Sequence, residues 1–288
     1  MRTTLRRALR HTLRPPPLHR HHHRPLHTTP PTRHSSVNPS EVSHFNALAS
    51  TWWDAHGSSR ILHLMNPLRH DFIASCLASS ATPTPPTGIR YLDVGCGGGI
   101  FAESAARLPT TRSVTAVDPT PNILAVARRH AAQDPALTAD KLRYLPATIE
   151  TLPDVLAPGE PPEFDVVTCF EVVEHVDHAA AFLDRCGAAV RPGGWLVLST
   201  IARTWTSWVT TKVVAEDVLG VVPRGTHDWH KYVNEDELRA HFAEGEGNRG
   251  RWGPAVVRGV VYVPGLGWKE VRGSEKVGNY FFAVQRLV

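Results

Sequence analysis

The chain has 288 residues, enough for one large α/β domain with an appendage. Its formal net charge of +4 arises at the N-terminus, because residues 1–40 hold eight arginines and no lysine, aspartate or glutamate. From residue 41 onward, 27 acidic residues face 23 basic ones, so this part carries a charge of about −4. A negative body without a basic stripe argues against nucleic acid as a partner.

The first 40 residues have the composition of a mitochondrial transit peptide, because they are rich in arginine and hydroxyl side chains and lack acids. A secretory signal is excluded, since no apolar run follows the basic start. The alternative is a disordered basic tail without a targeting role. The histidine tract 21–23 lies inside this leader, and no function is assigned to it.

Residues 41–80 are predicted to form helices ahead of the main domain. The first helix begins near Ser40, and a second is expected from Pro67 to about Leu77. The stretch 81–88 is rich in threonine and proline and reads as a linker.

From residue 81 to the C-terminus we expect one domain in which short apolar runs alternate with helical segments. This alternation indicates βαβ units and a parallel sheet. The expected strands are 90–94, 113–117, 142–145, 164–170 and 195–200, and the expected helices are 99–107, 121–133, 178–190 and 235–243. Two further strands, 256–263 and 280–284, suit an antiparallel hairpin at one edge. The prediction is a doubly wound α/β fold with a seven-stranded, mostly parallel sheet.

The sequence RYLDVGCGGG at residues 90–99 predicts a buried strand that ends in a glycine loop and opens onto a helix. Such a loop brings backbone N–H groups close to a bound nucleotide-like ligand. Gly95 and Gly97 are the candidate contact residues. Asp118 ends the next apolar run, where a carboxylate can accept both hydroxyls of a ribose.

One position argues against a dinucleotide as this ligand. The pattern G-x-G-x-x-G would need glycine at 100, where the chain has Ile100. An acid within the strand, Asp93, followed by G-x-G-G-G instead resembles the S-adenosylmethionine (SAM) site of the class I methyltransferases. The alternative is a glycine-rich turn without a ligand.

A second cluster of polar residues follows strand 164–170, in the sequence EVVEH. If this pentapeptide makes one helical turn, Glu171, Glu174 and His175 share a face beside the glycine loop. Two carboxylates and an imidazole can hold a divalent cation; zinc or manganese would accept this set more readily than magnesium. The alternatives are a polar rim of the cofactor pocket without a metal, and His175 acting as a general base.

Residues 201–232 form a long insertion that is more apolar than an ordinary surface loop. With Trp205 and Trp208 it is expected to be a lid, or an interfacial helix that receives an oily substrate from a bilayer. A helix packed on the core is the alternative. The polar residues 227–230 are expected to belong to the hinge of the lid.

The cysteines show no C-x-x-C pair, and Cys96 and Cys169 should be buried, which suits a reducing compartment. No stretch approaches the roughly 20 apolar residues of a membrane span. Any contact with a membrane is therefore expected to be peripheral.

Five segments together closely resemble the O-methyltransferases of ubiquinone biosynthesis. They are A-x-x-W-W-D at 49–54, M-N-P-L-R at 65–69, LDVGCGGG at 92–99, CFEVVEHV at 169–176 and VPRGTHDW at 222–229. The glycine motif is shared by many methyltransferases, whereas the WWD, NPLR and GTHD segments are specific to far fewer of them.

The resemblance implies SAM contacts at Arg69, Gly95, Asp118 and Phe170, with Gly97 in the same loop. It also implies magnesium at the three side chains of the EVVEH segment. The implied substrates are polyprenyl-dihydroxybenzoate and demethylubiquinol, each methylated on a catechol hydroxyl. The resemblance further implies peripheral attachment to the matrix side of the mitochondrial inner membrane, within a multisubunit coenzyme Q synthesis complex.

A catechol hydroxyl is a poor nucleophile near neutral pH, because phenols ionise near pH 10. A cation held by the EVVEH segment would lower the pKa of the hydroxyl and align it with the methyl group of SAM. Three alternatives stay open at this stage. They are a non-catalytic SAM-binding scaffold subunit, a methyltransferase for another small phenol, and a methyltransferase acting on protein or RNA.

Overall fold

The computed structural model describes residues 35–204 and 231–288, apart from positions 55, 58, 81, 83, 84 and 86. Nearly all of the predicted leader and most of the predicted insertion at 201–232 lie outside the described residues. The same holds for Trp205, Trp208 and the segment 227–230.

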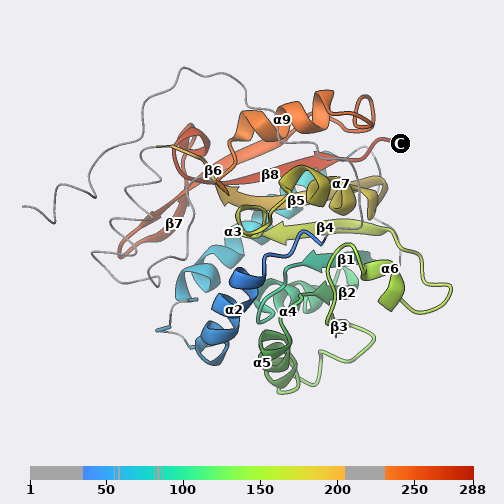
Figure 1. Cartoon of the computed structure of the whole chain (residues 1–288), viewed down its shortest axis with the longest axis vertical. Coiled ribbons are helices and arrows are strands. Elements are labelled where there is room, and N and C mark those ends of the chain that lie inside the picture. Colours follow the sequence, from blue (N-terminus) through green and yellow to red (C-terminus); the bar gives the residue numbers. More distant parts are fainter. Residues whose placement is uncertain are drawn as a thin grey trace, which may run out of the picture.

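One sheet of eight strands runs through the centre of the molecule (Figure 1). Its strands are β1 (Ile89–Val94), β2 (Thr111–Val117), β3 (Leu142–Leu145), β4 (Phe164–Phe170), β5 (Val190–Ile201), β6 (Val256–Val263), β7 (Gly267–Glu270) and β8 (Asn279–Gln285). They are hydrogen-bonded in the order β3-β2-β1-β4-β5-β8-β6-β7. The first five in this order are parallel, as the sequence predicts.

The C-terminal part of the sheet is antiparallel and holds one strand more than the predicted seven-stranded sheet. β8 pairs with both β5 and β6, and the additional strand β7 pairs with β6. β7 has no apolar run, so its sequence carries no strand signal. It is tied to the rest of the fold by Trp268, whose indole N–H donates to the carbonyl of Ile61 at 2.9 Å.

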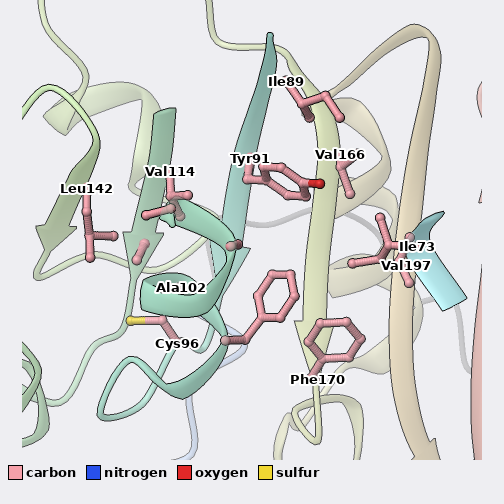
Figure 2. Close-up of a cluster of buried hydrophobic side chains, with 14 of the residues drawn as sticks. Ile73, Ile89, Tyr91, Cys96, Ala102, Val114, Leu142, Val166, Phe170 and Val197 are labelled. Carbon is pink, nitrogen blue, oxygen red and sulfur yellow. The ribbon is translucent and has the colours of Figure 1, made fainter. Parts of the chain in front are cut away.

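Helices cover both faces of the sheet, each over its own core. One face packs against α3 (Arg60–Ser79), α4 (Ile100–Ala106) and α5 (Pro121–Ala131). The other packs against α6 (Leu152–Val155), α7 (Ala179–Ala188) and α9 (Glu235–Glu244). Neighbouring strand residues alternate between the cores, with Tyr91 in the first and Leu92 in the second. Figure 2 shows the first core, with Tyr91 near Val166 and Phe170 at the end of β4.

Helix α3 begins at Arg60, well ahead of the predicted start at Pro67. Proline is disfavoured within a helix because it lacks the N–H that bonds the preceding turn. The helix continues through it because buried side chains anchor both sides, Met65 before and Phe72 after the proline. Arg69 is thereby carried on a continuous helix to the carboxyl edge of β4, where it reaches Phe170.

The N-terminal segment 36–54 contains α2 (Pro39–Leu48) and the 3-10 turn η1 (Ala49–Thr51). Helix α2 packs against α5 (Figure 1). At the other end of the segment, Val37 forms a bridge with Val176, just beyond β4. The segment therefore lies across the edge of the sheet at which β1, β2 and β4 end.

The four cysteines are buried and free. In the part of the chain that the structure describes, no helix combines the length and the apolar character needed to cross a bilayer.

Candidate active site

The glycine loop after β1 is packed so tightly that side chains are excluded from it. Gly95 and Gly97 have positive φ angles of 70° and 52°, which side chains rarely adopt. A Cβ on Gly95 would lie 2.6 Å from Cγ2 of Val172, and a Cβ on Gly97 would lie 2.5 Å from Cζ2 of Trp52. The loop thus brings bare backbone to the point where the strand order reverses between β1 and β4, which is where open α/β sheets bind ligands.

Asp118 follows β2 and closes on this loop. Its Oδ2 accepts a hydrogen bond from the N–H of Gly97 at 3.0 Å, and its Oδ1 accepts one from the N–H of Thr120 at 2.8 Å. Burial raises the pKa of this carboxyl, and the two backbone donors oppose that change. An ionised carboxylate accepts about four hydrogen bonds, so the side chain retains acceptor capacity for ligand hydroxyls.

Two buried charged residues lie behind the loop. Asp93 is only 3% exposed, and its carboxylate accepts a hydrogen bond from Thr168 Oγ1 at 2.8 Å. Burial raises the pKa of Asp93 to about 7, against the effects of that hydrogen bond and of the Arg69 charge. The guanidinium of Arg69 lies 4.7 Å from the ring centre of Phe170, and its Nε is buried without a partner.

The EVVEH segment does not form the single helical turn that its spacing predicts. Only Val173–His175 are helical, as the short 3-10 turn η2. Glu171 precedes the turn with a φ of 56°, which is unusual for a residue other than glycine. Its Oε1 accepts a hydrogen bond from Ser199 Oγ at 2.6 Å. Glu171, Glu174 and His175 therefore do not share one face.

Glu174 is the most buried of the three, at 4% exposure, and its Oε2 accepts a hydrogen bond from Thr200 Oγ1 at 2.9 Å. Burial raises the pKa of Glu174 to about 7, and the negative charge of Glu171 adds to this effect. The two carboxylates are thus close enough to repel each other, although they bond to different neighbours on β5.

His175 interacts with the N-terminal segment. Its Nδ1 lies 3.0 Å from Oε2 of Glu41, and the ring of Phe45 packs edge-on at 5.1 Å. Burial disfavours the charged imidazole, but the hydrogen bond to Glu41 and the nearby carboxylates outweigh burial and raise the pKa of His175. With Nδ1 donating to Glu41, a neutral ring keeps Nε2 as the acceptor.

The donor chemistry of this cluster fits a divalent cation, because one such cation would neutralise the charges of two carboxylates that repel each other. The described arrangement is not itself a metal site. Glu171, Glu174 and His175 are turned towards Ser199, Thr200 and Glu41, respectively. Among the described residues, no three His, Cys, Asp or Glu side chains converge where they could hold a metal ion.

The structure brings the predicted site residues to one edge of the sheet from four elements. Gly95 and Gly97 follow β1, Asp118 follows β2, Glu171 to His175 follow Phe170 of β4, and Arg69 comes from α3. Sequence reasoning did not include Glu41 or Trp52 among the site residues. Trp52 belongs to the motif A-x-x-W-W-D, but no local pattern indicates that this motif covers the glycine loop.

The fold and the site identify the chain as a SAM-dependent class I methyltransferase. A family model described as a methyltransferase domain matches residues 64–245. The plantazolicin methyltransferase BpumL in complex with SAH has the same fold, with a TM-score of 0.55 over 86% of this chain and 97% of that chain. At 13% identity, that likeness concerns the fold alone.

Comparison with curated relatives narrows the class to a family. The mitochondrial ubiquinone biosynthesis O-methyltransferase of Candida albicans is 39% identical, over 88% of this chain and 86% of its own length. The enzyme of the same name from Schizosaccharomyces pombe is 42% identical, over 88% of both chains. The chain belongs to the ubiquinone biosynthesis O-methyltransferase family and is a SAM-dependent O-methyltransferase.

The raised pKa of Asp93 predicts a pH-dependent stability. Since the folded carboxyl stays protonated to about pH 7 and the unfolded one ionises near pH 4, the stability contributed by Asp93 is lost as pH rises through about 7. Asp93→Asn removes this dependence. Between pH 5 and pH 9, the unfolding free energy of the wild type should fall relative to the variant by on the order of 2–4 kcal/mol, measured by urea denaturation.

Asp134→Asn is the matched control. The side chain of Asp134 lies at the surface, 28% exposed, and its pKa is lowered chiefly by the hydrogen bond from Arg107, so it stays ionised over the whole of this range. Its difference from the wild type should therefore not change between pH 5 and pH 9. Parallel pH profiles for the wild type and Asp93→Asn would contradict the raised pKa.

Proposed function

We propose that this enzyme transfers a methyl group from SAM to a catechol hydroxyl of polyprenyl-dihydroxybenzoate and of demethylubiquinol. The observation that carries the proposal is the position of His175 and its two acidic neighbours directly beyond β4, beside the glycine loop. The close packing of Gly95 against Val172 holds these two parts of the edge together. The names of the fungal and bacterial relatives support the substrate class.

The cofactor would be held by residues that already surround the loop. The backbone at Gly95 and Gly97 would approach the methionine and ribose portions, and Asp118 would accept the ribose hydroxyls. Arg69 is suited to the methionine carboxylate, because its Nε is a buried donor without a partner. Phe170, beneath the guanidinium, would complete this wall of the site.

The chemical step needs a catechol oxygen that has lost its proton. When bound, SAM supplies a methyl group on a positively charged sulfur, which needs no further activation. A divalent cation held by Glu171, Glu174 and His175 would lower the pKa of the hydroxyl. Loading it requires those side chains to exchange their present partners. The alternative is that His175 accepts the proton at Nε2 while Glu41 holds Nδ1.

Activity with each metal separates these possibilities. Purified protein is incubated with labelled SAM and a short-tailed dihydroxybenzoate, first in chelator and then with magnesium, manganese or zinc. We expect chelator to abolish methyl transfer and added cation to restore it. Glu171→Ala, Glu174→Ala and His175→Ala should each reduce kcat by about 100-fold or more while SAM affinity is kept.

Excess cation should partly restore a weakened ligand variant. Full activity in chelator, with His175→Ala alone inactive, would contradict the cation and assign proton removal to His175. A wild-type protein that is inactive under every condition would contradict the proposed substrate.

A second prediction concerns Asp118. If its carboxylate accepts the ribose hydroxyls, Asp118→Ala should weaken SAM binding by about 1.5–3 kcal/mol, the scale of a hydrogen bond to a charged group. Isothermal calorimetry measures the loss, and circular dichroism checks that the variant is folded. Unchanged affinity for SAM would contradict the proposal that Asp118 binds the ribose.

We further propose a mitochondrial location, peripheral on the matrix side of the inner membrane and within a multisubunit coenzyme Q synthesis complex. The arginine-rich composition of residues 1–40 and the mitochondrial names of the fungal relatives support import. A prenylated substrate supports contact with the lipid surface, for which the insertion at 201–232 is the candidate.

Fusion of residues 1–40 to a fluorescent protein tests the import proposal. The arginines without acids should direct the reporter to mitochondria, and a version with these arginines changed to glutamine should stay in the cytosol. Cytosolic fluorescence from both fusions would contradict the proposed location but leave the enzymatic activity unaffected.

A further inference from the structure

Trp52 carries a buried polar group with no partner, directly on the glycine loop. The side chain is 8% exposed, and its indole Nε1 has no hydrogen-bond acceptor. Buried polar groups in native proteins are nearly always paired, so an orphaned N–H needs an explanation. One explanation is that a bound ligand supplies the hydrogen-bond acceptor.

The indole packs directly against the glycine loop. It covers two consecutive glycines, since a Cβ on Gly98 would fall 2.2 Å from Cδ1 and 2.7 Å from Nε1 of Trp52. A second buried orphan belongs to the same loop: the hydroxyl of Tyr144 has no partner and would lie 2.1 Å from a Cβ on Gly99. Two side chains with unpaired polar groups thus pack on three consecutive glycines, 97 to 99.

The neighbouring tryptophan provides the contrast. The Nε1–H of Trp53 donates to the carbonyl of Gly98 at 2.8 Å, and its ring stacks on His130 with centres 3.4 Å apart. Trp53 therefore has a complete structural role, whereas the indole N–H of Trp52 lacks one. The difference lies between two adjacent residues of the same type on the same loop.

The segment that carries Trp52 is fastened on both sides of the site. Ser36 accepts a hydrogen bond from the N–H of Asp177, and Glu41 contacts His175. At the other end, Trp53 holds the loop itself. The segment that carries Trp52 thus contacts both the glycine loop and the residues beyond β4.

We propose that Trp52 is a cofactor-binding residue, whose indole N–H donates a hydrogen bond to an acceptor of the bound SAM or its demethylated product, S-adenosylhomocysteine. This rests on the proposed function. The unpaired N–H is held in place by segment 36–54, which closes over the loop. The donor is therefore positioned before the ligand binds, and pairing it favours the bound state.

Trp52→Phe and Trp53→Phe form the matched pair that tests this. Each keeps an aromatic ring and removes one indole N–H. We expect Trp52→Phe to weaken S-adenosylhomocysteine binding about tenfold by calorimetry, which corresponds to about 1.4 kcal/mol, and to lower the melting temperature of the ligand-free protein less than Trp53→Phe does. Trp53→Phe should lower the melting temperature, because it leaves the Gly98 carbonyl without its partner.

A second ligand, 5′-methylthioadenosine, locates the acceptor, since it lacks the amino-acid portion. If Trp52→Phe binds both ligands more weakly than the wild type does, the acceptor lies on the nucleoside. If it binds only S-adenosylhomocysteine more weakly, the acceptor lies on the amino-acid portion. Unchanged affinity for both would overturn the role of Trp52. A wild-type protein that binds neither ligand would contradict the proposed activity itself, and this proposal with it.

Discussion

The close packing around the glycine loop after β1 is the constraint on which the rest of the site depends. Because these residues have no Cβ, three separate elements reach the same few backbone atoms: Val172 beyond β4, Trp52 from the N-terminal segment and Tyr144 from β3. A side chain at any of these glycines would clash with at least one of the three. The loop is thus the point at which strand order, cofactor site and N-terminal cover are joined.

Buried charge is the second feature of this edge. Asp93 and Glu174 each have a pKa raised to about 7, chiefly by burial, and each depends on one threonine hydroxyl for its hydrogen bond. Arg69 offsets part of this negative charge, since it interacts with both Asp93 and Glu171. Such a network is unfavourable for stability alone, because charges lose hydration when they are buried. Its position at the carboxyl edge of the strands agrees with a site that binds a positively charged sulfonium cofactor.

The N-terminal segment connects the two halves of this site. Glu41 and Phe45 contact His175, where the substrate oxygen would react, and Trp52 lies on the loop that would hold the cofactor. A single short stretch of chain therefore contacts both proposed binding regions.

Much of the fold could be predicted because its signals are local. The strands 142–145 and 164–170 match their predicted ranges, since each is a short, mainly apolar run that ends before a break in the pattern. The glycine motif and Asp118 were found for the same reason. β7 could not be predicted, because it is a strand through its pairing with β6 and not through its own composition. For α3 the predicted start at Pro67 was wrong, because buried neighbouring side chains stabilise the helix on both sides of a residue that disfavours it.

The sequence alone therefore determined the class of fold, the glycine loop, its acid and the family, all of which depend on short patterns. The partners of the EVVEH side chains were decided only by the tertiary structure. Glu171 and Glu174 bond to residues of β5, and His175 bonds to Glu41, which is 134 positions away. No local spacing contains this information, because these side chains meet only once the strands are paired and the N-terminal segment is folded across their ends.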